Sequence, residues 1–311
     1  MGSRDEMRSR WNKLTTADHG YIRVDATHPL EWHIGYERSR HRTLLLVSPV
    51  EPPRLPSSRS IEVFRAVRAD GQWALQFRLI NSGHEDVFMR LCWDLVDSSR
   101  EKPPGRMAMQ FISRRYLEWS KLFQKGVDGL SRAQQKGLIG ELFCLRTLLE
   151  SAQLTATQAV SAWGGPDGAD RDFVVGEWWC EVKTIGGSAT TVQISSLEQL
   201  DINPSGELLV YVIESTTPGD ADGFTLNSVA EQVGHSLGGD VDAGELYAGK
   251  LIASGYVRRD EYDEMPYRLV GTARFYVDST FPRLTRRMVP SQVVAAKYEL
   301  ALGTLEPWKT K

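Results

Sequence analysis

The sequence has too little cysteine for several common kinds of site. Its three cysteines, Cys92, Cys144 and Cys180, are too few and too far apart for a disulfide framework or a CxxC metal site. The six histidines also show no metal-ligand spacing. These absences argue against a disulfide-stabilised scaffold and a cysteine- or histidine-based metal site, and we expect the cysteines to be buried as small hydrophobes.

Long apolar runs are lacking as well. No segment approaches the roughly 18 consecutive apolar residues that span a bilayer, and the N-terminal "MGSRDEMRSRW" has no apolar signal-peptide core. We therefore expect a cytoplasmic protein that has no membrane partner. Walker and dinucleotide-binding glycine loops are also absent from the sequence.

No charge of one sign dominates the chain. Its 311 residues include 37 Lys and Arg and 40 Asp and Glu, which gives a formal net charge of −3. Charge alone therefore leaves nucleic acid open as a partner. The content of 41% hydrophobic and 25% charged residues is typical of a soluble globular protein, and the length allows two domains.

The first hundred residues have the pattern of a β-rich domain. Apolar and polar residues alternate between turn signals in "RTLLLVSPV", "SIEVFRAVRADGQWALQFRLI" and "DVFMRLCWDLV". The proline-rich "PVEPPRLPSS" is predicted to be a loop outside the central strands. Because "SSREKPPGR" is typical of a linker, we predict a β-rich N-terminal domain over residues 1–104.

Residues 105–311 are predicted to form an α/β domain, with an α+β class for the whole chain. Helices are expected at about 106–125 and 131–150, followed by a hairpin over 171–184. The continuous apolar run "GELLVYVIES" is typical of a strand covered on both faces. Later helices are expected in "FTLNSVAEQVGHSL" and "AGELYAGKLIASG", and late strands in "RLVGTARFYV" and "SQVVAAKYELAL".

The hairpin "RDFVVGEWWCEVKT" carries charges among apolar residues. A two-residue turn at its centre sets Asp172 opposite Glu181. Strand side chains alternate between faces, so Lys183 shares the face of Glu181. Opposed carboxylates repel each other unless a cation intervenes, and Mg²⁺ takes one or two carboxylates while keeping water that a phosphate can replace. A solvated face with a cross-strand salt bridge is the alternative.

A third carboxylate, Glu141, is predicted to point into or beside the core. On a helical wheel it is flanked by apolar residues at offsets of three, four and seven, namely Leu138, Cys144, Leu145 and Leu148. Buried glutamates are uncommon unless they are paired or bound to a metal. A structural hydrogen bond or salt bridge remains an alternative role for Glu141.

These motifs follow one another in a specific order, with "GLIGELFCL", "WGGPDGADRDF", "EVK" and "QISSLEQL" between about residues 137 and 200. In this order they resemble the PD-(D/E)XK nuclease superfamily. More closely, they resemble a branch of PD-(D/E)XK proteins often met beside bacterial restriction and phage-defence genes. The resemblance implies a restriction-endonuclease-like mixed sheet flanked by helices, after the β-rich N-terminal domain.

The resemblance also implies which residues carry the chemistry. Asp172 and Glu181 would bind Mg²⁺, for which Mn²⁺ would substitute, together with the main-chain carbonyl of Val182. Lys183 would orient or activate the attacking water. Because these are the residues of a phosphodiesterase site, the resemblance predicts an Mg²⁺-dependent deoxyribonuclease.

Two further catalytic residues and one departure belong to the same comparison. Glu141 would support the metal site directly or through water, and Gln193 would position Lys183 or a phosphate. The literal "PD" contains Asp167, which precedes the strand by several residues. We therefore assign the motif aspartate to Asp172, with Asp170 as a weaker candidate.

The resulting prediction is a metal-dependent endonuclease that acts on DNA within a restriction or phage-defence system. Candidate phosphate contacts lie in "FPRLTRRM", at Arg283, Arg286 and Arg287. The alternatives are a non-cleaving nucleic-acid-binding or scaffold subunit that retains the nuclease fold, and an enzyme acting on RNA or a nucleotide. Protein partners from a defence or modification system and a homodimer stay open.

Three tryptophans near the motifs have two alternative roles. They could stack on bases, as aromatic side chains do in single-strand binders, or they could belong to the core. The residues concerned are Trp163, Trp178 and Trp179.

Overall fold

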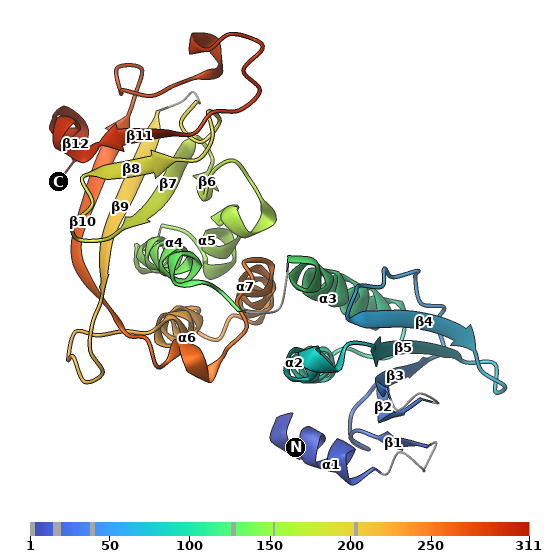
Figure 1. Ribbon diagram of the computed structural model, residues 1–311. Helices are drawn as coiled ribbons and strands as arrows, with labels where there is room; N and C mark the ends of the chain where they lie inside the picture. The colour runs from blue at the N-terminus through green and yellow to red at the C-terminus, as the bar shows by residue number, and fades with distance from the viewer. Residues whose placement is uncertain are drawn as a thin grey trace. The chain divides into compact units, whose positions relative to one another are not determined.

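The chain folds into two compact units, residues 1–129 and residues 130–311, which we describe separately. The computed structural model describes residues 4–14, 20–37, 41–125, 129–151, 153–201 and 205–310. Figure 1 traces these elements along the chain. In the part of the chain so described, no helix combines the length and apolar character needed to cross a bilayer.

The first unit is built on a five-stranded antiparallel sheet in the order β1-β2-β3-β5-β4. Its strands are β1 (Tyr21–Arg23), β2 (Glu31–Tyr36), β3 (Arg42–Ser48), β4 (Ile61–Val67) and β5 (Trp73–Leu79). The central β3 is buried along almost its whole length. The β4–β5 hairpin turns at Gly71, whose φ of 81° favours glycine.

Helices α1 (Arg4–Lys13), α2 (Glu85–Ser98) and α3 (Arg106–Lys125) complete the first unit. The prediction of a strand in "DVFMRLCWDLV" was wrong, because this segment lies in α2. Its buried residues include Phe88, Cys92 and Leu95, and their spacing of three and four residues places them on one face of a helix. Over so short a segment, apolar residues at helical spacing can be mistaken for the alternation of apolar and polar residues in a strand.

Helix α3 belongs to the first unit, although the predicted boundary at residue 104 placed it in the second. The ring of Tyr116 packs against Phe77 of β5, with ring centroids 4.9 Å apart. The indole Nε1 of Trp119 donates to Asp94 Oδ2 in α2 at 2.7 Å. These tertiary contacts extend the first unit to residue 129.

The second unit contains a mixed five-stranded sheet in the order β12-β10-β9-β7-β6, in which β7 and β9 are parallel. Its strands are β6 (Phe173–Val175), β7 (Trp178–Ile185), β9 (Gly206–Ser215), β10 (Tyr267–Val277) and β12 (Lys309–Thr310). A separate pair joins β8 (Thr191–Ile194) to β11 (Tyr298–Ala301). The predicted late strand "SQVVAAKYELAL" was wrong over most of its length, because only Tyr298–Ala301 forms a strand.

Different elements cover the two faces of this sheet (Figure 1). Helices α4 (Arg132–Glu150), α5 (Ala156–Ala162), α6 (Leu226–Ser236) and α7 (Val241–Ala253) share one core cluster with β7 and β9. The β8–β11 pair contributes to a second cluster with Trp179 and Leu208. The capping box of Ser131 and Gln134 starts α4. The chain therefore has the mixed α+β fold expected of a PD-(D/E)XK-like domain.

Short 3₁₀ helices connect several of these elements. They are η1 (Ser82–His84), η2 (Gly165–Asp167), η3 (Asp260–Tyr262), η4 (Arg286–Met288), η5 (Leu302–Thr304) and η6 (Glu306–Trp308). Of these, η2 matters most here, because it lies between α5 and the predicted site hairpin.

Candidate active site

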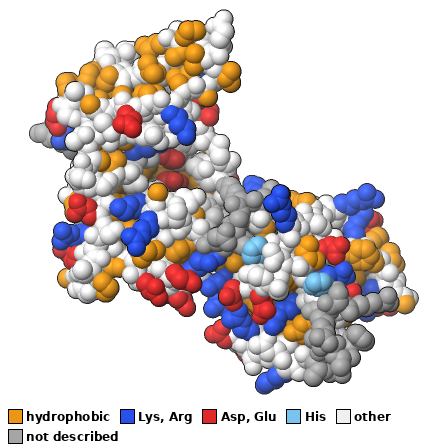
Figure 2. Space-filling model, in the orientation of Figure 1, with side chains coloured by type: hydrophobic (Ala, Val, Ile, Leu, Met, Phe, Trp, Pro, Cys, Tyr) orange, Lys and Arg blue, Asp and Glu red, His pale blue; other side chains and the backbone are white. Residues whose placement is uncertain are grey.

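The predicted site lies where β6 ends and β7 continues past it. Strand β6 pairs with β7 only as far as Phe173 opposite Cys180, in the predicted register. The next residues of β7, from Glu181 onward, pair with β9 on their other side. In the orientation of Figure 1, the second unit is hollowed beside these strands and acidic side chains lie within the hollow (Figure 2).

Asp172 directly precedes β6 and reaches this edge of β7. Its Oδ2 accepts a hydrogen bond from the main-chain N–H of Val182 at 2.8 Å. The bond occupies a backbone donor that β6 is too short to pair, and it holds the Asp172 carboxylate beside the strand that carries Glu181. Asp172 therefore caps the edge of the sheet as well as contributing charge.

Glu181 and Lys183 lie together on one face of β7. Lys183 Nζ is 2.6 Å from Glu181 Oε1, and the Glu181 side chain is only 1% exposed. Phe173, Cys180 and Val182 pack in the helix-covered cluster on the opposite face, as predicted. Among the described residues, neither carboxylate oxygen of Glu181 has a partner in hydrogen-bond geometry. Oε1 forms the ion pair with Lys183, and Oε2 remains able to bind another group.

Glu141 reaches the same place from α4. The indole Nε1 of Trp163 donates to its Oε2 at 2.6 Å. A Cβ on Gly165 would lie 2.9 Å from Glu141 Oε2 and 3.0 Å from Asp172 Oδ1. Both carboxylates therefore press against the same backbone position in η2, which has room only for glycine.

Burial and the charge of Asp172 disfavour the ionisation of the two glutamates. Burial, followed by the charge of Asp172, raises the pKa of Glu181 from 4.5 to about 8, although Lys183 acts in the opposite direction. Burial and then the charge of Asp172 also raise the pKa of Glu141. Burial raises the pKa of Asp172, against the hydrogen bond from Val182. A cation in this cluster would relieve the cost of three buried negative charges.

The donor set fits a hard divalent cation. Carboxylate oxygens suit Mg²⁺ or Mn²⁺, and Glu181 has a buried Oε2 without a hydrogen-bond partner among the described residues. Within the described ranges, no group of three or more His, Cys, Asp or Glu side chains is arranged so that it could hold a metal ion. Asp172 and Glu181 would therefore leave several coordination positions to water and substrate, as is usual for Mg²⁺.

The literal "PD" aspartate lies apart from this cluster. Asp167 Oδ2 is 2.9 Å from Nζ of Lys250, a buried lysine of α7 that also donates to the carbonyl of Trp163. Asp170 is exposed. The geometry thus brings Asp172 to Glu181 and gives Asp167 a role in attaching η2 to α7.

Gln193 is not brought to Lys183. It lies on β8 opposite Glu299 and is exposed, whereas its neighbours Val192 and Ile194 are buried in the cluster beneath β8. Because strand side chains alternate, Gln193 points away from the sheet that carries Lys183.

The three arginines of "FPRLTRRM" differ in their surroundings. Arg286 Nη2 donates to Glu198 Oε1 at 2.8 Å, and its Nη1 donates to the carbonyl of Val293 at 2.6 Å. Arg283 Nη1 donates to the carbonyl of Leu200. These two arginines fasten surface loops together. Arg287 is exposed and has no partner among the residues that the structure describes.

The tryptophans have structural roles. Trp163 and Trp179 are 0% and 1% exposed, which leaves no ring face for base stacking. Trp178 is half-buried. Arg171, which sequence reasoning missed, lies over the Trp179 ring at 5.5 Å and lowers the pKa of Glu181 by its charge.

Trp163 and Gly165 were also missed as site residues. Both lie in "WGGPDGADRDF", the motif in which only the aspartates are predicted as site candidates. The Gly-Gly pair before the aspartate was the available signal. Its meaning depends on the approach of Glu141 from α4, which no local pattern reveals.

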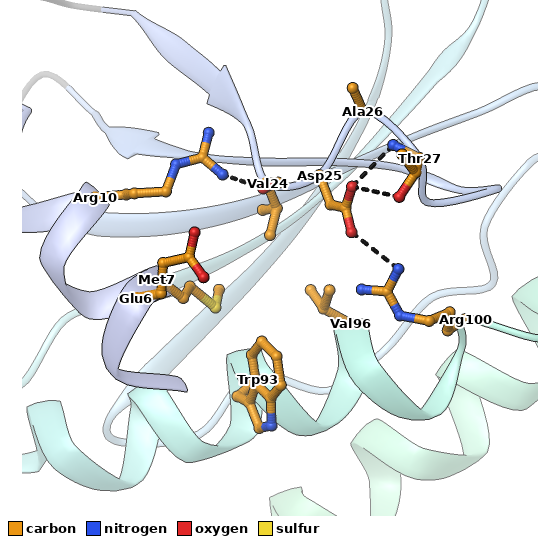
Figure 3. Close-up of a pocket in the computed structure, with 10 residues that line it drawn as sticks. All are labelled: Glu6, Met7, Arg10, Val24, Asp25, Ala26, Thr27, Trp93, Val96 and Arg100. Atoms are coloured by element: carbon orange, nitrogen blue, oxygen red, sulfur yellow. Dashed lines mark hydrogen bonds and ion pairs between the residues drawn. The ribbon is translucent and has the colours of Figure 1, made fainter. Parts of the chain in front are cut away.

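A cavity of about 330 Å³ in the first unit is a weaker candidate. Figure 3 shows that Asp25 turns to Thr27 and Arg100, and that Arg10 turns to the backbone of Val24. Asp25 accepts from Thr27 N at 2.8 Å and from Arg100 Nη1 at 2.9 Å, while Arg10 Nη2 donates to the carbonyl of Arg23 at 2.8 Å. These bonds hold Asp25, Arg100 and Arg10 within the unit.

Comparison with known proteins adds one match. A family model described as "Putative PD-(D/E)XK family member, (DUF4420)" matches residues 7–303. No curated protein and no solved structure matches the chain. The matched range includes nearly all of both units, so the first unit is part of the family pattern.

Proposed function

The chain belongs to the PD-(D/E)XK-related family DUF4420, and we propose that it is a metal-dependent nuclease that hydrolyses DNA phosphodiester bonds. The observation that carries this proposal is the meeting of Asp172, Glu181, Lys183 and Glu141 where β7 extends beyond β6. From the resemblance of its motifs, we assign the activity to an endonuclease of a restriction or phage-defence system.

Asp172 and Glu181 would hold Mg²⁺ or Mn²⁺, and the Val182 carbonyl would be a further ligand. Oδ1 of Asp172 and Oε2 of Glu181 are available for this, since Val182 N–H occupies Oδ2 of Asp172 and Lys183 contacts Oε1 of Glu181. When bound, the metal ion supplies Lewis-acid stabilisation of the charge that develops on the phosphoryl oxygens.

The remaining residues orient water and move protons. Lys183 presents its ammonium group to the attacking water or a phosphoryl oxygen, and its ion pair with Glu181 fixes where that group lies. Trp163 fixes the orientation of Glu141. Because the pKa of Glu141 is raised, its carboxylate can hold a proton near neutral pH and accept or release one beside the site.

The test is incubation of the pure protein with supercoiled, linear and single-stranded DNA and with RNA, in Mg²⁺, Mn²⁺ or EDTA. We expect DNA cleavage with either metal and none in EDTA. Nicking of a closed circle would identify an endonuclease. Cleavage of RNA alone would overturn the substrate, and DNA binding without cleavage of any substrate would favour a non-cleaving binding or scaffold subunit.

A further inference from the structure

The two units carry net charges of opposite sign. Residues 1–129 contain 21 Lys and Arg and 16 Asp and Glu, a net charge of +5, whereas residues 130–311 contain 16 and 24, a net charge of −8. The candidate active site thus belongs to the acidic unit, whose overall field repels a polyanion. The basic unit is therefore the one whose net charge attracts a nucleic acid.

One groove of the first unit has an excess of positive charge. It has a volume of about 750 Å³ and lies between α3 and the segment before β4. The charged residues that line it are Glu51, Arg65, Arg106 and Arg114. Arg65 Nη1 and Glu51 Oε1 are 2.9 Å apart and neutralise each other, so Arg106 and Arg114 determine the charge of the groove.

The two arginines form part of one stripe along α3. Arg106, Gln110 and Arg114 recur every four residues and are exposed, so they follow one helix face over about 12 Å at 1.5 Å per residue. Neither arginine forms an ion pair or hydrogen bond with any residue that the structure describes. Glu118, the acid nearest in sequence to Arg114, is instead 3.9 Å from Arg115.

The opposite wall of the groove is fixed in place. Pro52 and Pro53 line it, and the proline-rich segment is attached to the sheet because Arg65 donates to the carbonyl of Pro52. At its far end, the hydroxyl of Tyr116 in α3 donates to the carbonyl of Pro56 at 2.8 Å. The groove therefore exists before any ligand binds. A phosphate could contact Arg106 and Arg114 without first breaking an ion pair within the described part of the protein.

We propose that this groove binds the sugar–phosphate backbone of a DNA duplex. Guanidinium groups match phosphate oxygens in geometry and charge, and a glutamine between them can donate to the same strand. No aromatic side chain lines the groove among the residues that the structure describes, whereas single-strand sites stack bases on aromatic rings. The choice of DNA as the polyanion rests on the proposed nuclease function, but the groove itself belongs to the unit that lacks the candidate active site.

The experiment measures binding of a short fluorescent DNA duplex to the full chain in EDTA, where cleavage cannot interfere. The test variant is Arg106→Gln with Arg114→Gln. The matched control is Lys13→Gln with Arg132→Gln, which removes two exposed positive charges that do not line the groove. Loss of two phosphate contacts should weaken binding by about tenfold or more at low salt and lower the slope of log K against log salt by about 1.8.

The control variant should stay close to wild type in both quantities. Equal losses in the two variants, no loss in the test variant, or a preference for single-stranded DNA would overturn the proposal. So would binding of an acidic peptide through Arg106 and Arg114 without binding of DNA. A protein that binds duplex DNA through these arginines yet cleaves nothing with Mg²⁺ would support the groove and contradict the proposed nuclease, which separates the two failures.

Discussion

At the scale of single residues, Lys183 and Asp172 are the side chains that the proposed chemistry cannot lose. Lys183→Ala removes the cation beside Glu181, and Asp172→Ala removes a metal ligand together with the cap on Val182 N–H. We expect each to reduce DNA cleavage by about 100-fold or more. Asp167→Ala should do much less, because Asp167 contacts Lys250 rather than the carboxylate cluster.

The measurement is the rate of plasmid cleavage with Mg²⁺, with circular dichroism as a check that each variant is folded. A different order of cleavage rates among these variants would contradict the assignment of Asp172 as the motif aspartate. If Asp167→Ala is inactive and Asp172→Ala cleaves normally, the aspartate of the motif is Asp167 and the capping role of Asp172 is its only one.

Glu181 should make the stability of the metal-free protein depend on pH. Its pKa in the folded protein is about 8, against an ordinary value of 4.5. Between these values the folded state binds more protons than the unfolded state, so the free energy of unfolding falls as pH rises. The contribution is fully present below about pH 4.5 and is lost as pH rises through about 8.

The measurement is urea unfolding in EDTA across this pH range, for the wild type and Glu181→Gln. Glutamine cannot ionise, so the variant should lose less stability between pH 6 and pH 9 than the wild type does. Parallel pH profiles for the two proteins would show that Glu181 does not carry this dependence.

At the scale of elements, close packing of α4 on β7 brings Glu141 to the site. A Cβ on Gly140 would lie 2.5 Å from Cγ2 of Thr184 and 3.3 Å from Cγ1 of Val182, whereas a Cβ on Gly137 would meet nothing within 4 Å. Gly140→Ala should therefore push helix and strand apart and destabilise the protein by about 1–3 kcal/mol. Gly137→Ala should stabilise it by about 0.4–1 kcal/mol.

These two variants differ by one turn of the same helix, so each is the control for the other. Their chemical denaturation midpoints give the comparison directly. Equal effects would mean that α4 does not depend on this approach. A stable Gly140→Ala variant that also keeps full activity would show that Glu141 tolerates a shift of its helix.

The elements also show what a sequence can predict. Helix α4 and the β6–β7 hairpin follow from local periodicity and turn chemistry, and the alternation of β7 correctly separates Lys183 from Val182. The roles of Trp163 and Gly165 depend on α4, η2 and β6 meeting in space. The direction of the Gln193 side chain could not be predicted from the sequence. Which face of β8 is buried depends on packing against the five-stranded sheet, to which β8 does not belong.

At the scale of the whole molecule, the sequence did not predict where the first unit ends and the second begins. A linker pattern near residue 100 is real in composition, but α3 beyond it packs on α2 and β5 through Trp119 and Tyr116. Proline and glycine mark where the chain turns and not which core the next helix joins. The opposite charges of the two halves were likewise hidden in a net charge near zero.

Because the carboxylates all belong to the second unit, metal binding should change the thermal stability of that unit. Without metal, Asp172 lies beside Glu141 and Glu181, and its charge should weaken the second unit by repulsion wherever the pH is high enough to ionise the glutamates. Asp172→Asn removes one charge and keeps an oxygen that can accept from Val182 N–H. The variant should therefore keep or raise the melting temperature in EDTA, whereas loss of a purely structural aspartate would lower it.

Metal should then separate the two proteins. Binding to the folded state alone adds about 1.4 kcal/mol at ten times Kd, a shift of a few degrees for a unit of this size. The wild type should gain this with Mg²⁺ or Mn²⁺, and Asp172→Asn should not. If the units unfold separately, only the transition of residues 130–311 should move, because the carboxylates all belong to that unit. Thermal melts of both proteins across a metal titration measure this. Equal metal responses of the two proteins would contradict a metal-binding role for Asp172, as would a variant less stable than the wild type in EDTA. Asp172 would then serve only to cap Val182 N–H.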